Sequence, residues 1–341
     1  TFVTEYNKRL HWFAVFTAIG TFCLIIAGGL VTSTGSGLAV PDWPLSYGQL
    51  MPPMVGGIFY EHSHRLVATT VGLLTIIITI WIWKKEQRRW VKILGLFTLA
   101  TIVVQGALGG LTVLMMLPTA VSVTHATLAQ TFFCLVSTIA LVTSRWWTQT
   151  INVKLTIHPN KTTLILSISI SFIVYIQLVL GALVRHTGSG LAVPDFPLAY
   201  GQLLPSLSDE SLEQYNRYLI YEDMRLAADG PITKGQVIIH MLHRYWAIFV
   251  SAGIVLLITR LWRERWTIFK VYSFLLSILI FVQILLGAFT VLSQKSIEIA
   301  TAHVSVGALL LVCTFLATMS VSRISLSSVH FRVEHAREVI A

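Results

Sequence analysis

Four histidines recur at matching places within apolar segments that are long enough to cross a membrane. They are His64, His125, His243 and His303, and the two in each half are separated by 61 and 60 residues. An ionisable side chain inside a bilayer is costly, so it indicates a functional site. Two imidazoles at one depth on neighbouring helices can clamp a metal ion between them. The alternative is a set of interfacial histidines that only make hydrogen bonds.

The ligand count favours one kind of metal centre. Zinc would need two further protein ligands, and neither half supplies a cysteine or an acidic cluster that serves both histidines. Haem iron needs only axial ligands, because the porphyrin supplies the other four. The pattern therefore predicts a bis-histidine haem in each half, held by His64 and His125 in the first and by His243 and His303 in the second.

The two halves differ three residues before the first histidine of each pair. The first half has Glu61 in "EHSHR", and the second has His240 in "HMLHR". Residues three apart share a helix face, so Glu61 should point toward whatever His64 binds. A partly buried carboxylate there can take and give protons. We therefore expect a working site in the first half and an electron-transfer or structural site in the second, unless Glu61 merely sits at the interface.

An arginine directly follows one histidine of each pair. Arg65 and Arg244 lie near the outer surface, where a guanidinium fork suits a carboxylate such as a haem propionate. Snorkelling toward water is the alternative for both. His62 lies on another face of its helix and receives no role.

The composition indicates what must position these residues. The chain has 341 residues, of which 55% are hydrophobic and only 11% charged, whereas soluble domains carry about a quarter charged residues. Runs of roughly 20 apolar residues match the hydrocarbon thickness of a bilayer. We predict an all-α integral membrane protein with eight spans: 11–33, 58–83, 91–114, 119–143, 162–184, 236–261, 267–292 and 299–322.

The basic residues report orientation. The net charge is +9, yet Lys and Arg form short clusters between spans, such as "KKEQRR" at 84–89 and "RLWRER" at 260–265. This pattern places both termini inside and gives no basic patch for nucleic acid. The glycine- and proline-rich loops then face outward, which is the periplasmic side in a bacterium, the expected location, and the intermembrane side in a mitochondrion. The longest outer loop, about 206–234, is mixed and leans acidic.

One of these outer loops occurs twice. "GSGLAVPDWPLSYGQLMP" at 35–52 and "GSGLAVPDFPLAYGQLLP" at 188–205 share fifteen of eighteen residues. The chain is therefore a tandem duplication of four-helix units, 1–150 and 151–341. Four is even, so the two bundles are parallel, and bundle cores commonly hold cofactors. We expect Asp42 and Asp195 to form structural turns and each loop to cap one pocket.

Small residues also recur within the spans. "QGALGG", "QLVLGA" and "QILLGA" begin at Gln105, Gln177 and Gln283. Close helix packing explains them, and close approach of a flat ligand is the functional alternative. The three cysteines, Cys23, Cys134 and Cys313, lie in apolar runs and read as small buried hydrophobes.

The chain resembles the heme A synthase family over all eight spans. The resemblance lies in "TGSGLAVPDWPLSYGQL", "EHSHR", "VTHATLAQ", "TGSGLAVPDFPLAYGQL", "HMLHR" and "TAHVSVGAL". It implies oxidation of a ring methyl of heme O to a formyl group, through an alcohol and a hydrate, to give heme A for cytochrome oxidase. It implies His64 and His125 as ligands of the substrate haem, Glu61 as the catalytic carboxylate, and His243 and His303 as ligands of a resident heme b.

The resemblance also implies partners. These are the farnesyltransferase that makes heme O, assembly factors of cytochrome oxidase, membrane lipid, and an electron acceptor that quinone could serve; a homo-oligomer is compatible with it. Many bacterial members carry a cysteine pair in the first outer loop, and this chain has none there. Two other functions stay open from the residues alone: a di-haem b-type electron carrier linked to quinol, and a haem or metabolite transporter.

Overall fold

Eight long helices form most of the part of the chain that the structure describes. The computed structural model describes residues 6–149, 161–224 and 230–340, with side chains as far as Ser325. The long helices are α1 (Lys8–Ser33), α2 (Gly56–Lys85), α3 (Arg89–Leu114), α4 (Thr119–Val142), α6 (Lys161–His186), α8 (Lys234–Arg263), α9 (Thr267–Leu292) and α10 (Ile297–Ile340). All eight contain a segment long and apolar enough to cross a membrane, which confirms the predicted all-helical integral membrane protein.

Local sequence explains where these helices begin. The Asn7 side chain accepts a hydrogen bond from the Leu10 backbone at the start of α1. Pro118, which has no N–H to satisfy, directly precedes α4. Thr233 and Gln236 form a reciprocal capping box at the start of α8. These caps lie close to the predicted span boundaries because hydrophobicity and capping residues change at the same points.

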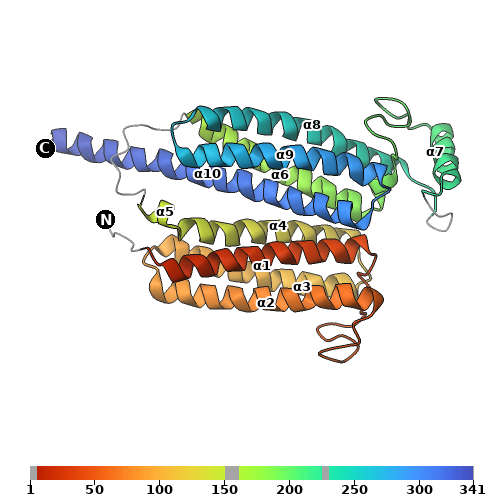
Figure 1. Cartoon of the computed structure of the whole chain (residues 1–341), viewed down its shortest axis with the longest axis horizontal. Coiled ribbons are helices and arrows are strands. Elements are labelled where there is room, and N and C mark those ends of the chain that lie inside the picture. Colours follow the sequence, from red (N-terminus) through yellow and green to blue (C-terminus); the bar gives the residue numbers. More distant parts are fainter. Residues whose placement is uncertain (1–5, 150–160, 225–229, 341) are drawn as a thin grey trace.

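The helices contact one another in two groups of four. Helix α1 contacts α2 and α4, and α3 contacts both α2 and α4. The second group repeats this arrangement with α6, α8, α9 and α10. Across the seam between the groups, α10 contacts α1 and α4, and α4 also contacts α6. Figure 1 shows the two groups lying side by side, with the last part of α10 running past the other helices.

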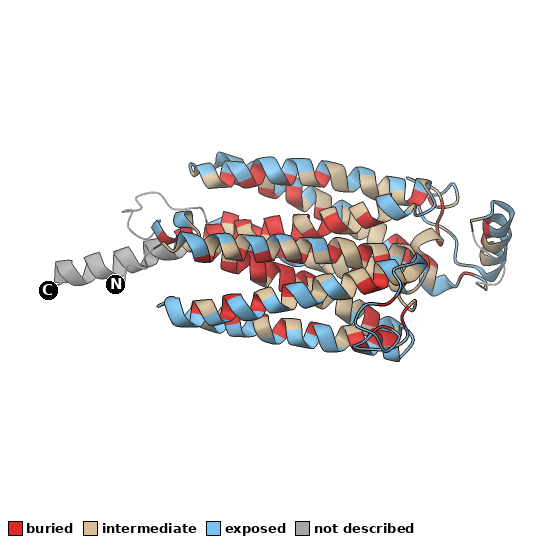
Figure 2. Ribbon diagram, turned by 60° about the horizontal axis from the view of Figure 1, so that its bottom comes forward, coloured by how far each residue is buried: buried red, intermediate tan, exposed pale blue. Residues whose placement is uncertain are grey.

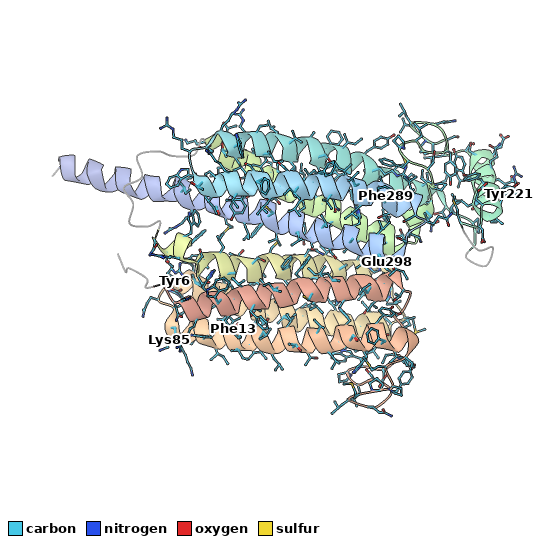
Figure 3. All side chains as sticks on the ribbon, viewed as in Figure 1. Tyr6, Phe13, Lys85, Tyr221, Phe289 and Glu298 are labelled. Carbon is cyan, nitrogen blue, oxygen red and sulfur yellow. The ribbon has the colours of Figure 1, made fainter. Side chains whose placement is uncertain are left out.

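The two ends of the molecule differ in character. Both chain termini lie at one end, and the connections after α1 and α6 lie at the other (Figure 1). Figure 3 places Lys85 and Tyr6 toward the first end, and Glu298 and Tyr221 toward the second. The long outer connections therefore share one face of the bundle, which we call the outer end.

Burial follows the pattern expected for a protein surrounded by lipid. Buried positions concentrate between the helices, and exposed positions cover the outward surfaces (Figure 2). Many exposed residues are large and apolar, including Trp12, Phe16 and Phe281. Cys134 and Cys313 are buried as predicted, but Cys23 is exposed. The prediction for Cys23 was wrong because an apolar residue of a membrane helix can face the lipid, so its apolar character does not show that it is buried inside the protein.

A short helix in the second outer connection was not predicted. Helix α7 (Asp209–Tyr221) begins at Ser208, whose side chain accepts from the Ser211 backbone. Tyr215 is buried and stacks on Tyr200, with ring centroids 3.6 Å apart. The helix is thus attached to the repeated loop. A second short helix, α5 (Arg145–Gln149), follows α4 on the opposite end of the bundle.

Candidate functional site

The four predicted histidines occupy equivalent places in the structure. Each lies within the outer half of an even-numbered span, on α2, α4, α8 or α10. His64 interacts electrostatically with His125, and His243 with His303. The fold therefore brings together the members of each predicted pair, one pair in each group of four helices.

Each histidine ring packs against a glycine on the preceding long helix. A Cβ atom built on Gly28 would lie 3.2 Å from Nε2 of His64, and one on Gly109 would lie 3.2 Å from Cε1 of His125. In the second half, Gly181 and Gly287 bring a Cβ to 3.1 Å from His243 and His303, respectively. Any larger residue would press on the imidazole. The recurring small residues therefore have a specific function, which is to let a helix backbone pass against a histidine ring.

Two glutamines hold their histidines from the same neighbouring helices. Gln105 donates from Nε2 to the backbone carbonyl of His125 at 2.9 Å. Gln177 makes the equivalent bond to His243 at 3.1 Å. Each glutamine lies one helical turn before the glycine that meets the same ring. On α1, the residue in this position is Leu24, so within the described residues no glutamine holds His64 in this way.

The donor set fits a haem better than a bare metal ion. In 6–149, 161–224 and 230–325, no three His, Cys, Asp or Glu side chains gather as ligands of an ion. A pair of imidazoles is sufficient for haem iron. In the same described residues, Nδ1 of His125 and Nδ1 of His303 are buried without a hydrogen-bond partner. Such orphaned polar atoms require an explanation, and a small rotation of each ring on binding a ligand would supply one.

Glu61 is part of a network that attaches the first outer loop to α2. Glu61 is buried, its Oε1 lies 2.6 Å from Nη2 of Arg65, and its Oε2 accepts from the Val40 backbone at 2.8 Å. Arg65 also donates to the carbonyls of Val40, Asp42 and Leu45. The carboxylate is therefore fixed in place by the helix and the loop together.

The second half repeats this network without the carboxylate. Arg244 donates from Nε to Nε2 of the buried His240 at 3.1 Å. It also donates to the carbonyls of Val193 and Leu198. Both arginines therefore hold their loops, a role that depends on a loop folding back onto its helix. Their pairing with haem propionates stays a prediction.

The repeated aspartates form turns, as predicted. Asp42 accepts from the backbone N–H of Tyr47 at 2.7 Å and of Gly48 at 2.8 Å. Asp195 accepts in the same way from Tyr200 and Gly201. The hydrogen bonds from Gly48 and Tyr47 hold the pKa of Asp42 below its ordinary value, because they favour the charged carboxylate. Each aspartate thus stabilises the loop that carries it.

Comparison with known proteins decides the family. Residues 11–56 and 54–315 match the model of COX15-CtaA, described as cytochrome oxidase assembly protein. The chain belongs to the COX15-CtaA family. All four histidines and Glu61 lie inside the matched segments.

Several bacterial relatives of this COX15-CtaA chain bear the name heme A synthase. The protein of Alkalihalophilus pseudofirmus is 28% identical over 332 residues, which cover 93% of this chain and 99% of the relative. That of Geobacillus kaustophilus is 30% identical over 302 residues, covering 87% and 86%. The match to the protein of Lysinibacillus sphaericus is 31% identical, but it spans 58% of this chain and 65% of the relative.

Two further polar residues of the COX15-CtaA chain make contacts that the sequence did not predict: His62, which received no role, and Arg185, which was not considered. His62 is buried, and its Nδ1 lies 2.8 Å from Oγ of Ser46 in the first outer loop. Arg185 donates from α6 to α1 across the seam between the two groups of helices. Arg185 could have been noticed by comparing the two copies of the repeat. It lies at the end of an apolar span, and the residue that matches it in the first copy is Thr32.

Proposed function

We propose that the chain is a heme A synthase, a membrane oxidoreductase that converts a ring methyl of heme O into a formyl group. One observation carries the proposal: two equivalent histidine pairs are built on equivalent helices, and only the first half has a buried carboxylate, Glu61, three residues before the first histidine of its pair, where the second half has His240. The names of the full-length relatives support the same reaction.

The two halves would hold two different haems. His64 and His125 bind the substrate heme O, next to Glu61, and the product heme A leaves from the same pocket. His243 and His303 bind a resident heme b, which supplies one-electron redox chemistry when bound. The glycines opposite the four rings give each imidazole a defined plane. A defined plane is needed because axial ligands must present a nitrogen to iron in a narrow range of positions.

Glu61 would handle protons. Conversion of a methyl to a formyl group with water as the oxygen donor, –CH3 + H2O → –CHO + 4 H⁺ + 4 e⁻, releases protons as well as electrons, so the pocket needs a base near the reacting methyl and the electrons pass to an external acceptor. The bonds from Arg65 and from the Val40 backbone fix both carboxylate oxygens. Because Arg65 also holds the outer loop, the loop must be in place for Glu61 to be oriented. Arg65 is therefore a positioning residue, and Glu61 is the group that takes the proton.

The chemistry of the substrate indicates the partners and the membrane location of the protein. Heme O carries a farnesyl chain, so its supply by a membrane farnesyltransferase and its delivery to cytochrome oxidase assembly factors would keep it within the bilayer. We place the protein in a bacterial plasma membrane with both haem pockets toward the periplasmic face, and we assign the electrons to an acceptor of the quinone class. The fifteen-residue identity between the two loops supports a shared role as covers of the two pockets.

A substitution at Glu61 tests the proposal against a matched change in the second half. Glu61→Gln removes the base and keeps one side-chain oxygen, which can accept from Arg65 or from the Val40 N–H, so one of these two hydrogen bonds is lost. We expect heme A formation in cells supplied with heme O to fall about 100- to 10,000-fold, with both haems still bound. His240→Gln keeps an acceptor for Arg244 and should retain heme A formation. Undiminished heme A formation in Glu61→Gln would remove the catalytic assignment, and protohaem alone in both halves would indicate an electron carrier.

A further inference from the structure

Arg185 lies next to the second histidine pair and on the same side of α6. It follows Gly181 by four residues, and residues four apart on a helix share a face. Gly181 is the residue whose backbone meets the His243 ring. Arg185 also interacts electrostatically with His303 on α10. The Cα of Arg185 is thus one helical turn farther toward the outer end than Gly181, the residue that meets the His243 ring.

The arginine uses only part of its hydrogen-bonding capacity. Nη2 donates to the Gly29 carbonyl at 2.6 Å and to Oγ of Ser33 at 2.7 Å, both on α1. Ser33 in turn lies 3.0 Å from Oγ1 of Thr301 on α10. Among the described residues, Nη1 and Nε make no hydrogen bond and no carboxylate pairs with Arg185. A half-buried cation in a membrane span that lacks a protein counter-ion calls for an anion.

A porphyrin held by His243 and His303 would bring such an anion. Haem propionates are carboxylates on one edge of the macrocycle, and a guanidinium binds a carboxylate through two parallel N–H bonds. A haem whose propionates face the nearer aqueous surface would direct them outward, toward the level of Arg185. The other arginines near the pockets, Arg65 and Arg244, already donate to loop carbonyls.

The first half lacks this feature. The residues that match Gln177 and Arg185 on α1 are Leu24 and Thr32. The Thr32 hydroxyl donates to the Gly28 carbonyl within its own helix, so it offers no free donor and no charge. The second pair therefore has a glutamine and a cation on α6, the first helix of its group, whereas the first pair has on α1 an aliphatic side chain and a hydroxyl that is already bonded.

We propose that Arg185 binds a propionate carboxylate of the haem ligated by His243 and His303, and so retains that haem in the protein. The absence of an equivalent cation at Thr32 leaves the first pocket able to release its haem. This inference rests on the proposed division between a resident and an exchangeable haem, and it assigns a carboxylate-binding role to the seam between the two groups of helices.

The rate of haem loss from the second pocket tests the proposal. The full-length protein with His64→Ala and His125→Ala keeps only the second pair, and transfer of its haem to apomyoglobin can be followed by absorbance. Arg185→Leu in this background should accelerate loss roughly tenfold to a hundredfold, as expected for a charged hydrogen bond. Arg185→Lys, which keeps the charge, should restore part of the retention.

Two controls distinguish binding of a haem carboxylate by Arg185 (an anchor) from a purely structural link between α6 and α1 (a staple). Ser33→Ala removes the hydrogen bond across the seam but keeps the guanidinium, so retention should stay within about twofold of the parent. Iron protoporphyrin dimethyl ester has no free carboxylate, and with this ligand Arg185→Leu should have no further effect. Equal acceleration by Ser33→Ala and Arg185→Leu, or an undiminished effect of Arg185→Leu with the ester, would overturn the proposal in favour of a staple.

The outcome also separates this inference from the proposed function. No change on Arg185→Leu in a protein that binds haem would show that lipid or water neutralises the cation, and would contradict the anchor alone. Failure of the parent to bind any haem through His243 and His303 would contradict the proposed function itself.

Discussion

Replacement of Gly109 by alanine should displace the His125 ring. A Cβ at this position would lie 3.2 Å from Cε1 of His125, whereas carbon atoms in contact are ordinarily about 3.5–4.0 Å apart. The added methyl therefore overlaps the ring by about 0.3–0.8 Å. Metal–ligand distances are held within about 0.2 Å, so the displacement is large enough to disturb ligation.

The expected magnitude follows from the cost of overpacking. Inserting a methyl into a filled site costs about 1–3 kcal/mol, which corresponds to a haem affinity weaker by roughly fivefold to 150-fold. The helix itself gains about 1 kcal/mol when glycine becomes alanine, so the protein should remain folded. The loss should therefore appear in haem binding rather than in the thermal stability of the protein without haem.

A neighbouring glycine on the same helix provides the control. Nothing lies within 4 Å of a Cβ built on Gly106, three residues earlier on α3. Spectral titration of each variant with haem, in the background His243→Ala and His303→Ala, measures affinity at the first pocket and the low-spin signature of two imidazole ligands. Gly106→Ala should bind like the parent. If Gly109→Ala binds haem as tightly as Gly106→Ala, then Gly109 is not needed to leave room for the His125 ring.

Two further predictions concern the first pocket and its loop. Leu24→Gln should supply His64 with the hydrogen bond that Gln177 gives His243, and one such bond contributes about 1 kcal/mol. Haem loss from the first pocket to apomyoglobin should therefore slow about fivefold. An unchanged rate would contradict the equivalence of the two positions. Asp42 has a depressed pKa in the folded loop, so its contribution to loop stability is complete above the ordinary aspartate value of about 3.9 and is lost as the pH falls through the folded pKa. Pepsin should therefore cut the 35–52 loop increasingly at lower pH in the parent relative to Asp42→Asn, which does not titrate there, and identical pH profiles in the two proteins would refute this role.

Much of the architecture was predictable because the membrane simplifies the sequence. Spans must be apolar over their whole length, so the predicted boundaries lie near the observed ones at both ends of α3 and α9. Helix α7 was missed because it is short and its apolar residues, such as Tyr215 and Leu219, alternate with charged and polar ones, so it forms no long apolar run. The serine before it and the acidic first turn were a signal for a helix start.

The site was predictable in its residue types but not in its contacts. Duplicated histidines and the single Glu61 could be recognised because two copies of one unit can be compared with each other. The partners of Arg65 could not, because its bonds to the loop depend on how the chain turns after Asp42. The same holds for Gly28 and the other ring-facing glycines, whose neighbours come from a different helix.

The most direct test of the account is the identity of the porphyrin held by each histidine pair. Mass spectrometry of porphyrins extracted from purified His64→Ala and His243→Ala variants would provide it. The account predicts that His64→Ala loses the farnesylated porphyrin and keeps protohaem, and that His243→Ala does the reverse. Protohaem as the only pigment in both variants, or a parent protein that binds no porphyrin when haem is supplied, would contradict it.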